Sequence, residues 1–142
     1  MAKRILIPVA TTHDVGAVTV AGAFAREHGA TVRLVRVVPV PERVVGPYGR
    51  TIAYVDQEME RLTAKGREEL ELAQAQLPGV PVESIVRFGE PVEEILLEAE
   101  AFDADLIAVT TEQRGRIARA VAPDVADRLL QSSPVPVLVV RE

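Results

Sequence analysis

The sequence contains no cysteine and no tryptophan, and its 142 residues include only two histidines. Without cysteine the chain has no disulfide, no thiolate nucleophile and no zinc–thiolate site. His13 and His28 lie on either side of a predicted helix, so we expect no metal site. Aromatic residues make up only 4% of the chain, whereas 48% of the residues are hydrophobic, and this predicts an aliphatic core.

An excess of positive charge and long hydrophobic runs are also missing. The formal net charge is −5, and a nucleic-acid footprint needs clustered positive charge, so we expect no nucleic-acid partner. The opening MAKRILIPV holds only about five successive apolar residues. A signal-peptide core needs roughly 7–15 and a membrane span about 20. We therefore predict a first strand here, no membrane contact and a cytoplasmic location.

What the sequence does contain is a strict alternation of strand-like and helix-like segments. The five predicted strands are Lys3–Val9, Thr31–Val38, Pro81–Arg87, Asp105–Thr111 and Val135–Val140. The four predicted helices run from Asp14 to about His28, from about Ile52 to Leu77, from Pro91 through Phe102, and through Val121, Val125 and Leu129 to Pro134. This alternation predicts a single α/β domain over residues 1–142, with an open, doubly wound sheet of five parallel strands of the Rossmann-like or flavodoxin-like kind.

Residues at the ends of the predicted helices support these boundaries. Asp14 can cap the first helix and Gly29 can end it. Pro91 suits the first turn of the third helix, where Glu93 and Glu94 lie near the positive end of the dipole. We interpret the acidic residues of this helix as surface charge, because no histidine, lysine or metal partner is near them in the sequence.

The segment Pro39–Arg50 carries three prolines and two glycines. Such a composition is typical of a long loop or flap. Two interpretations stay open for it: a lid or partner contact, or a variable surface excursion.

Three stretches of the chain resemble the universal stress protein (UspA) family. They are RILIPV before the first helix, VRFGEPVEEILLEAEAFDADLIAV, and RGRIARAV followed by DVADRLLQSSPVPVLVVR. The resemblance covers essentially the whole chain. It implies a sheet of strand order 3-2-1-4-5 and usually a homodimer. In many members it also implies an ATP or AMP site between the loops that follow the first and fourth strands.

The nucleotide-binding members share an Asp at the end of the first strand and a loop of the type G-x-x-G, nine residues, then G and Ser or Thr. In this sequence the Asp is replaced by Ala10, the first two glycines by Thr110 and Gln113, and the closing pair by Pro123 and Asp124. Side chains at glycine positions hinder the approach of backbone N–H groups to phosphate, and proline removes a donor. The added carboxylate repels phosphate. These losses together turn a micromolar site into a millimolar one or worse.

The residues that would line this crevice share a place at the carboxyl ends of the strands. They are Val9, Ala10 and Thr11 after the first strand, Val38 at the end of the second, and Thr110, Gln113, Arg114, Gly115 and Asp124 after the fourth.

Two of these candidates have alternative interpretations. Asp124 also suits the N-cap of the last helix, with Asp127 near the same dipole end. Arg114, Arg116 and Arg119 could hold an anion by guanidinium contacts, or they could belong to a solvated loop that pairs with Glu112. We interpret Arg128 as a surface residue.

From these departures we expect a stress-response or regulatory protein without tight ATP binding and without a cofactor. The alternative is that the crevice still binds ATP, AMP or another small anion. We expect no enzyme activity, because the sequence shows no nucleophile–base pair, no metal cluster and no intact phosphate loop.

The last predicted strand, Val135–Val140, is hydrophobic and would lie at a sheet edge, where unpaired backbone groups invite a partner strand. The resemblance implies two-fold antiparallel pairing at this edge, as in an isologous homodimer. Pro136 lacks an N–H and should limit that ladder. We expect a homodimer and leave open a further, unidentified protein partner.

Overall fold

The computed structural model describes residues 3–10, 15–41, 44–45, 51–53, 55–111 and 125–141. Five strands form one parallel sheet, in the order β5 (Val82–Phe88), β2 (Thr31–Val38), β1 (Arg4–Pro8), β6 (Leu106–Thr111) and β7 (Val137–Arg141). Counting only these strands along the chain, the order is 3-2-1-4-5. The fold class predicted from the sequence is therefore confirmed.

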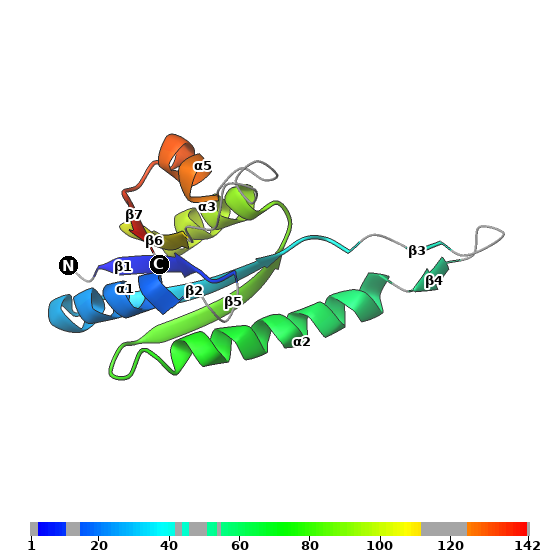
Figure 1. Cartoon of the computed structure of the whole chain (residues 1–142), viewed down its shortest axis with the longest axis horizontal. Helices are drawn as coiled ribbons and strands as arrows, with labels where there is room; N and C mark the ends of the chain where they lie inside the picture. The colour runs from blue at the N-terminus through cyan, green and yellow to red at the C-terminus, as the bar shows by residue number, and fades with distance from the viewer. Residues whose placement is uncertain are drawn as a thin grey trace.

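Four described helices cover the two faces of the sheet: α1 (Val15–His28), α2 (Val55–Gln74), α3 (Pro91–Phe102) and α5 (Val125–Ser132). Helices α1 and α2 pack on one face, and α3 and α5 on the other (Figure 1). None of the helices in the described ranges has the length and apolar character needed to cross a membrane.

The core is aliphatic on both faces of the sheet, because successive strand residues alternate between them. Ile5 and Ile7 of β1 point toward α1, whereas Leu6 points toward α3, and none of the three is more than 1% exposed. Phe102 is the one buried aromatic residue among those that the structure describes.

The helix ends follow the sequence signals. Gly29 ends α1 with a φ of 67°, a conformation that glycine adopts without strain. Pro91 occupies the first turn of α3, and Glu90 is its N-cap. Asp103 follows the last residue of α3 in the left-handed conformation, with a φ of 56°. Asp14 lies outside the described residues.

The segment predicted as a loop contains a short strand, β3 (Val44–Val45), which pairs antiparallel with β4 (Thr51–Ala53). The second helix begins at Val55, so the predicted start near Ile52 is wrong. The helical spacing of apolar residues continues into this segment, but the β-branched residues in β3 and β4 favour strand pairing there. Figure 1 shows β3 and β4 beyond the start of α2, away from the five-stranded sheet.

The sheet has two open edges, formed by β5 and β7. At the β7 edge, the Ile107 N–H donates to the Pro136 carbonyl oxygen at 3.0 Å, so the backbone of Pro136 is directed toward β6. In a parallel ladder the next residue directs its N–H and C=O the other way, which places those of Val137 and Val139 at the open edge. The position without an N–H at Pro136 therefore faces β6 and not the open edge. The extent of pairing with a partner strand stays a prediction.

Candidate functional site

The winding of the sheet reverses at β1, which pairs with β2 on one side and with β6 on the other. The chain leaves β1 toward α1 and leaves β6 toward α5 on the opposite face. In doubly wound sheets, the position beyond the carboxyl ends of two such strands is the expected ligand crevice. The register pairs Leu6 with Ile107, and both strands run on in parallel toward Val9 and Thr110. Val9, Ala10 and Thr110 thus follow or end neighbouring strands at the same edge of the sheet.

Thr110 is bonded to the first turn of α1. Its Oγ1 atom accepts a 2.8 Å hydrogen bond from the N–H of Ala17. Ala17 belongs to the turn whose N–H groups have no acceptor within the helix, and such groups commonly bind anions. The hydroxyl of the protein itself therefore takes one of the donors that a bound anion could use.

Val9 and Val38 are buried at the carboxyl ends of β1 and β2. Val9 is 2% exposed, and its N–H donates to the Val35 carbonyl oxygen at 2.8 Å. Val38 is 6% exposed, and its carbonyl oxygen accepts from the N–H of Gly89 at 2.9 Å. The Val9 N–H and the Val38 carbonyl oxygen are therefore already bonded within the protein.

The remaining predicted site residues lie outside the described residues: Thr11, Gln113, Arg114, Gly115 and Asp124. The same holds for five other residues of the sequence prediction: Glu112, Arg116, Arg119, Val121 and Pro123. Over the ranges that are described, no group of three or more His, Asp or Glu side chains is arranged to hold a metal ion.

The sequence interpretation missed a link between α3 and α5 near this edge. The Glu90 carboxylate accepts a hydrogen bond from the N–H of Glu93 at 2.8 Å, and its other oxygen lies 2.6 Å from Nη1 of Arg128. The backbone hydrogen bond from Glu93, and then the Arg128 guanidinium, lower the pKa of Glu90. A helix cap before Pro91 can be predicted from the sequence. The ion pair between Glu90 and Arg128 cannot, because it depends on how α3 and α5 pack.

The interpretation of the acidic residues of α3 as surface charge is wrong for Glu98, which is 1% exposed. Its carboxylate accepts hydrogen bonds from Nη1 of Arg33 at 2.8 Å and from Nη1 of Arg87 at 3.0 Å. Arg33 on β2 and Arg87 on β5 lie on the face that α3 covers. Burial alone lowers the pKa of both arginines, but their hydrogen bonds to glutamates more than offset it and raise the pKa overall.

Of the predicted site residues that the structure describes, Val9, Ala10 and Val38 are aliphatic. Thr110 carries the one hydroxyl among them, and it is already bonded to α1.

Comparison with known proteins connects this geometry to a family. The sequence model of the Universal stress protein family matches residues 1–141. The universal stress protein in QAH/OAS sulfhydrylase 3′ region of Thermus aquaticus is 31% identical over 144 residues, which cover 99% of this chain and 100% of that protein.

Solved structures share the fold. A protein from the universal stress protein family from Burkholderia pseudomallei has a TM-score of 0.73 at 22% identity, with 97% of this chain and 95% of that chain covered. A universal stress protein in complex with cAMP has a TM-score of 0.66 at 18% identity, with 99% and 97% covered. Since the family match spans residues 1–141, this chain belongs to the universal stress protein family.

Proposed function

We propose that this chain acts as a regulatory or protective universal stress protein that does not hold ATP tightly. The observation that carries the proposal is the hydrogen bond between the Thr110 hydroxyl and the Ala17 amide. Thr110 stands where the nucleotide-binding pattern has its first loop glycine, and glycine there lets the backbone come close to a phosphate. Here a side chain fills that position and is bonded to the protein itself.

The end of β1 supports the same conclusion. Ala10 stands where the nucleotide-binding pattern has an aspartate, and a methyl group accepts no hydrogen bond from a ligand. Pro123 and Asp124, which are known from the sequence alone, would remove a further amide and add a negative charge. Each of these exchanges should lower the affinity for a nucleotide, and all of them would affect the same bound ligand.

Isothermal titration calorimetry with ATP tests this proposal, with AMP and cAMP titrated in the same way. We expect no binding with a dissociation constant of about 10 µM or tighter, which corresponds to about 7 kcal/mol of binding free energy. Binding at or below that concentration would overturn the proposal.

A second candidate function is the binding of a nucleotide or another small anion at lower affinity in the same crevice. Two observations favour it: a protein of the same fold has been solved in complex with cAMP, and the sequence that follows β6 contains Arg114 and Arg116. Mass spectrometry of ligand released from denatured protein would identify such a molecule. No released ligand, together with no thermal shift from a panel of phosphate compounds, counts against this candidate.

We also propose that the chain is not an enzyme. The described crevice residues include no nucleophile paired with a base, so hydrolysis of ATP should be absent. Phosphate release from ATP in the presence of the protein should equal that of a buffer blank. Release above the blank that is lost in Thr110→Val would contradict this.

Finally, we propose a homodimer that forms through the β7 edge. Support comes from the outward N–H and C=O groups of Val137 and Val139, and from Leu138, which is 36% exposed. An antiparallel pairing of two β7 strands would satisfy those backbone groups and cover apolar surface. Light scattering at micromolar protein concentration should give twice the mass of one chain.

A further inference from the structure

Helix α3 carries two rows of acidic residues that have different surroundings. On the side toward β2 and β5, Glu94 and Glu98 pair with Arg87, and Glu98 pairs also with Arg33. On the other side lie the carboxylates of Glu93, Glu100 and Asp103, a set that we call the outer acidic row. In the described structure no lysine or arginine pairs with any of these three.

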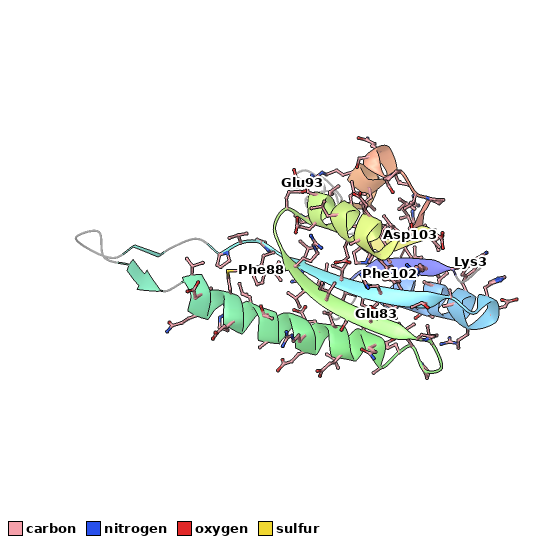
Figure 2. All side chains as sticks on the ribbon, turned by 180° about the vertical axis from the view of Figure 1, so that it is seen from behind. Lys3, Glu83, Phe88, Glu93, Phe102 and Asp103 are labelled. Atoms are coloured by element: carbon pink, nitrogen blue, oxygen red, sulfur yellow. The ribbon has the colours of Figure 1, made fainter. Side chains whose placement is uncertain are left out.

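The outer acidic row borders an apolar groove of about 620 Å³ between α3 and the turn that leads into β7. The apolar residues of the groove are Leu96, Leu97, Ala99, Ala104, Pro134 and Val135, and no basic residue lines it. Leu97 is 50% exposed although it is a large apolar side chain. Figure 2 shows Glu93 and Asp103 at opposite ends of α3, so the negative charge borders the groove along its whole length.

The spacing within the groove indicates the shape of what fits it. Glu93 and Glu100 are seven positions apart on one helix, roughly 10.5 Å along its axis at 1.5 Å per residue. Leu96 and Leu97 lie between them, three and four positions after Glu93. A second helix presents matching groups if it has basic residues seven positions apart with apolar residues three and four positions after the first.

We propose that the groove bordered by the outer acidic row binds an amphipathic basic helix of a partner protein. The apolar face of such a helix would cover Leu97, and its lysine or arginine residues would meet Glu93 and Glu100. The groove shares no residue with the crevice at β1 and β6, so the proposal does not depend on whether nucleotide binds.

Charge disfavours the other occupants. A second copy of this chain in a two-fold contact about the groove would bring Glu93 and Glu100 close to the same residues of the partner. An anionic membrane surface and a nucleic acid would be repelled by the same carboxylates. A basic helix removes this repulsion and buries the leucines at the same time.

The test uses a fluorescent synthetic helix of about 14 residues, or about four turns, with lysines seven positions apart and leucines three and four positions after the first. A matched peptide carries glutamate in place of both lysines. Fluorescence anisotropy with the full chain should show the basic peptide binding about tenfold or more tightly than the acidic one. Failure of the basic peptide to bind at millimolar protein would overturn the proposal.

Protein variants locate the binding. Leu97→Ser should weaken binding of the basic peptide about tenfold. Leu72→Ser is the matched control, since Leu72 is 57% exposed on α2, away from the groove, and it should leave binding unchanged. The double variant Glu93→Lys/Glu100→Lys should prefer the acidic peptide, which a mere loss of folding cannot produce.

Three results would contradict the proposal. Equal effects of Leu97→Ser and Leu72→Ser would place the peptide elsewhere on the surface. A fall in mass by light scattering in Leu97→Ser alone would identify a second copy of this chain as the occupant. Binding of the protein to phosphatidylserine vesicles that Leu97→Ser abolishes would identify a membrane.

Discussion

The Glu98 carboxylate accepts a 2.8 Å hydrogen bond from Arg33, a residue 65 positions earlier in the chain. The same guanidinium lies 4.3 Å from the centre of the Phe102 ring, a distance at which a cation is attracted to an aromatic face. Because Glu98 also bonds Arg87, one buried carboxylate joins α3 to the two strands β2 and β5. The outermost strand on this side is therefore held by an ionic contact as well as by its backbone ladder.

We expect Glu98→Gln to lower the free energy of unfolding by about 3 kcal/mol, because it leaves two arginines without their buried counter-charge. Glu83→Gln is the matched control: Glu83 also pairs with Arg33, but its side chain is 58% exposed. An exposed pair contributes at most about 1 kcal/mol. Urea unfolding of both variants measures the two losses in free energy of unfolding. Equal losses would show that burial does not increase the contribution of the Glu98 ion pairs to stability.

The Glu90 carboxylate should make stability depend on pH in the acid range. Its pKa is lowered in the folded chain, so its contribution is present above the ordinary glutamate pKa of about 4.3 and is lost as pH falls through the lowered folded value. The midpoint temperature of Glu90→Gln should therefore lie below that of the unchanged protein at pH 7. This difference in midpoint temperature between the two proteins should disappear as pH falls below about 4.

A second variant separates the two causes of this pKa shift. In Arg128→Gln the hydrogen bond from the Glu93 N–H to Glu90 remains, so part of the pH dependence should persist. The prediction fails if the gap between the unchanged protein and Glu90→Gln is the same at pH 7 and pH 3.

Restoring the nucleotide-binding pattern should restore affinity for ATP. The restored variant changes Ala10→Asp, Thr110→Gly, Gln113→Gly, Pro123→Gly and Asp124→Ser. Recovery of about 3 kcal/mol would tighten the dissociation constant by about two orders of magnitude, measurable by calorimetry. Thr110→Gly alone serves as the control, since it frees the Ala17 amide but restores only one position. If the variant with all five substitutions gains no affinity for ATP, the exchanged residues do not determine nucleotide binding.

Dimer formation should depend on the outward N–H of Val139. Val139→Pro removes this donor from the open edge of β7, whereas Val139→Ala reduces packing without removing it. We expect light scattering to give a monomer for Val139→Pro and a dimer for Val139→Ala. A dimer in both variants would place the interface elsewhere.

Much of the fold could be predicted because its signals are local. Five of the eight residues of Thr31–Val38 are β-branched, and the strand has those bounds. Gly29 and Pro91 mark helix ends through their own backbone preferences, and both lie where expected. The helix start near Ile52 was wrong because Thr51–Ala53 forms a strand that pairs with Val44–Val45.

The contacts that define the site could not be predicted from local sequence patterns. The Thr110 hydroxyl meets the Ala17 amide across 93 positions of sequence, and no spacing rule connects them. In the same way, burial of Glu98 requires arginines on two neighbouring strands. Val9, Ala10 and Thr110 were nevertheless placed at the correct edge, because parallel strands bring their carboxyl ends together.

The central position of β1 bears on how the chain folds as it is made. Arg4, near the beginning of the chain, hydrogen-bonds Asp105, 101 positions later. On the ribosome, β1, β2 and β5 can align early, but β1 stays bare along one side until β6 emerges. Within this sheet, β1 is thus made before the other strands but is among the last to be paired along both edges, and its unpaired backbone groups are open to incorrect partners in that interval.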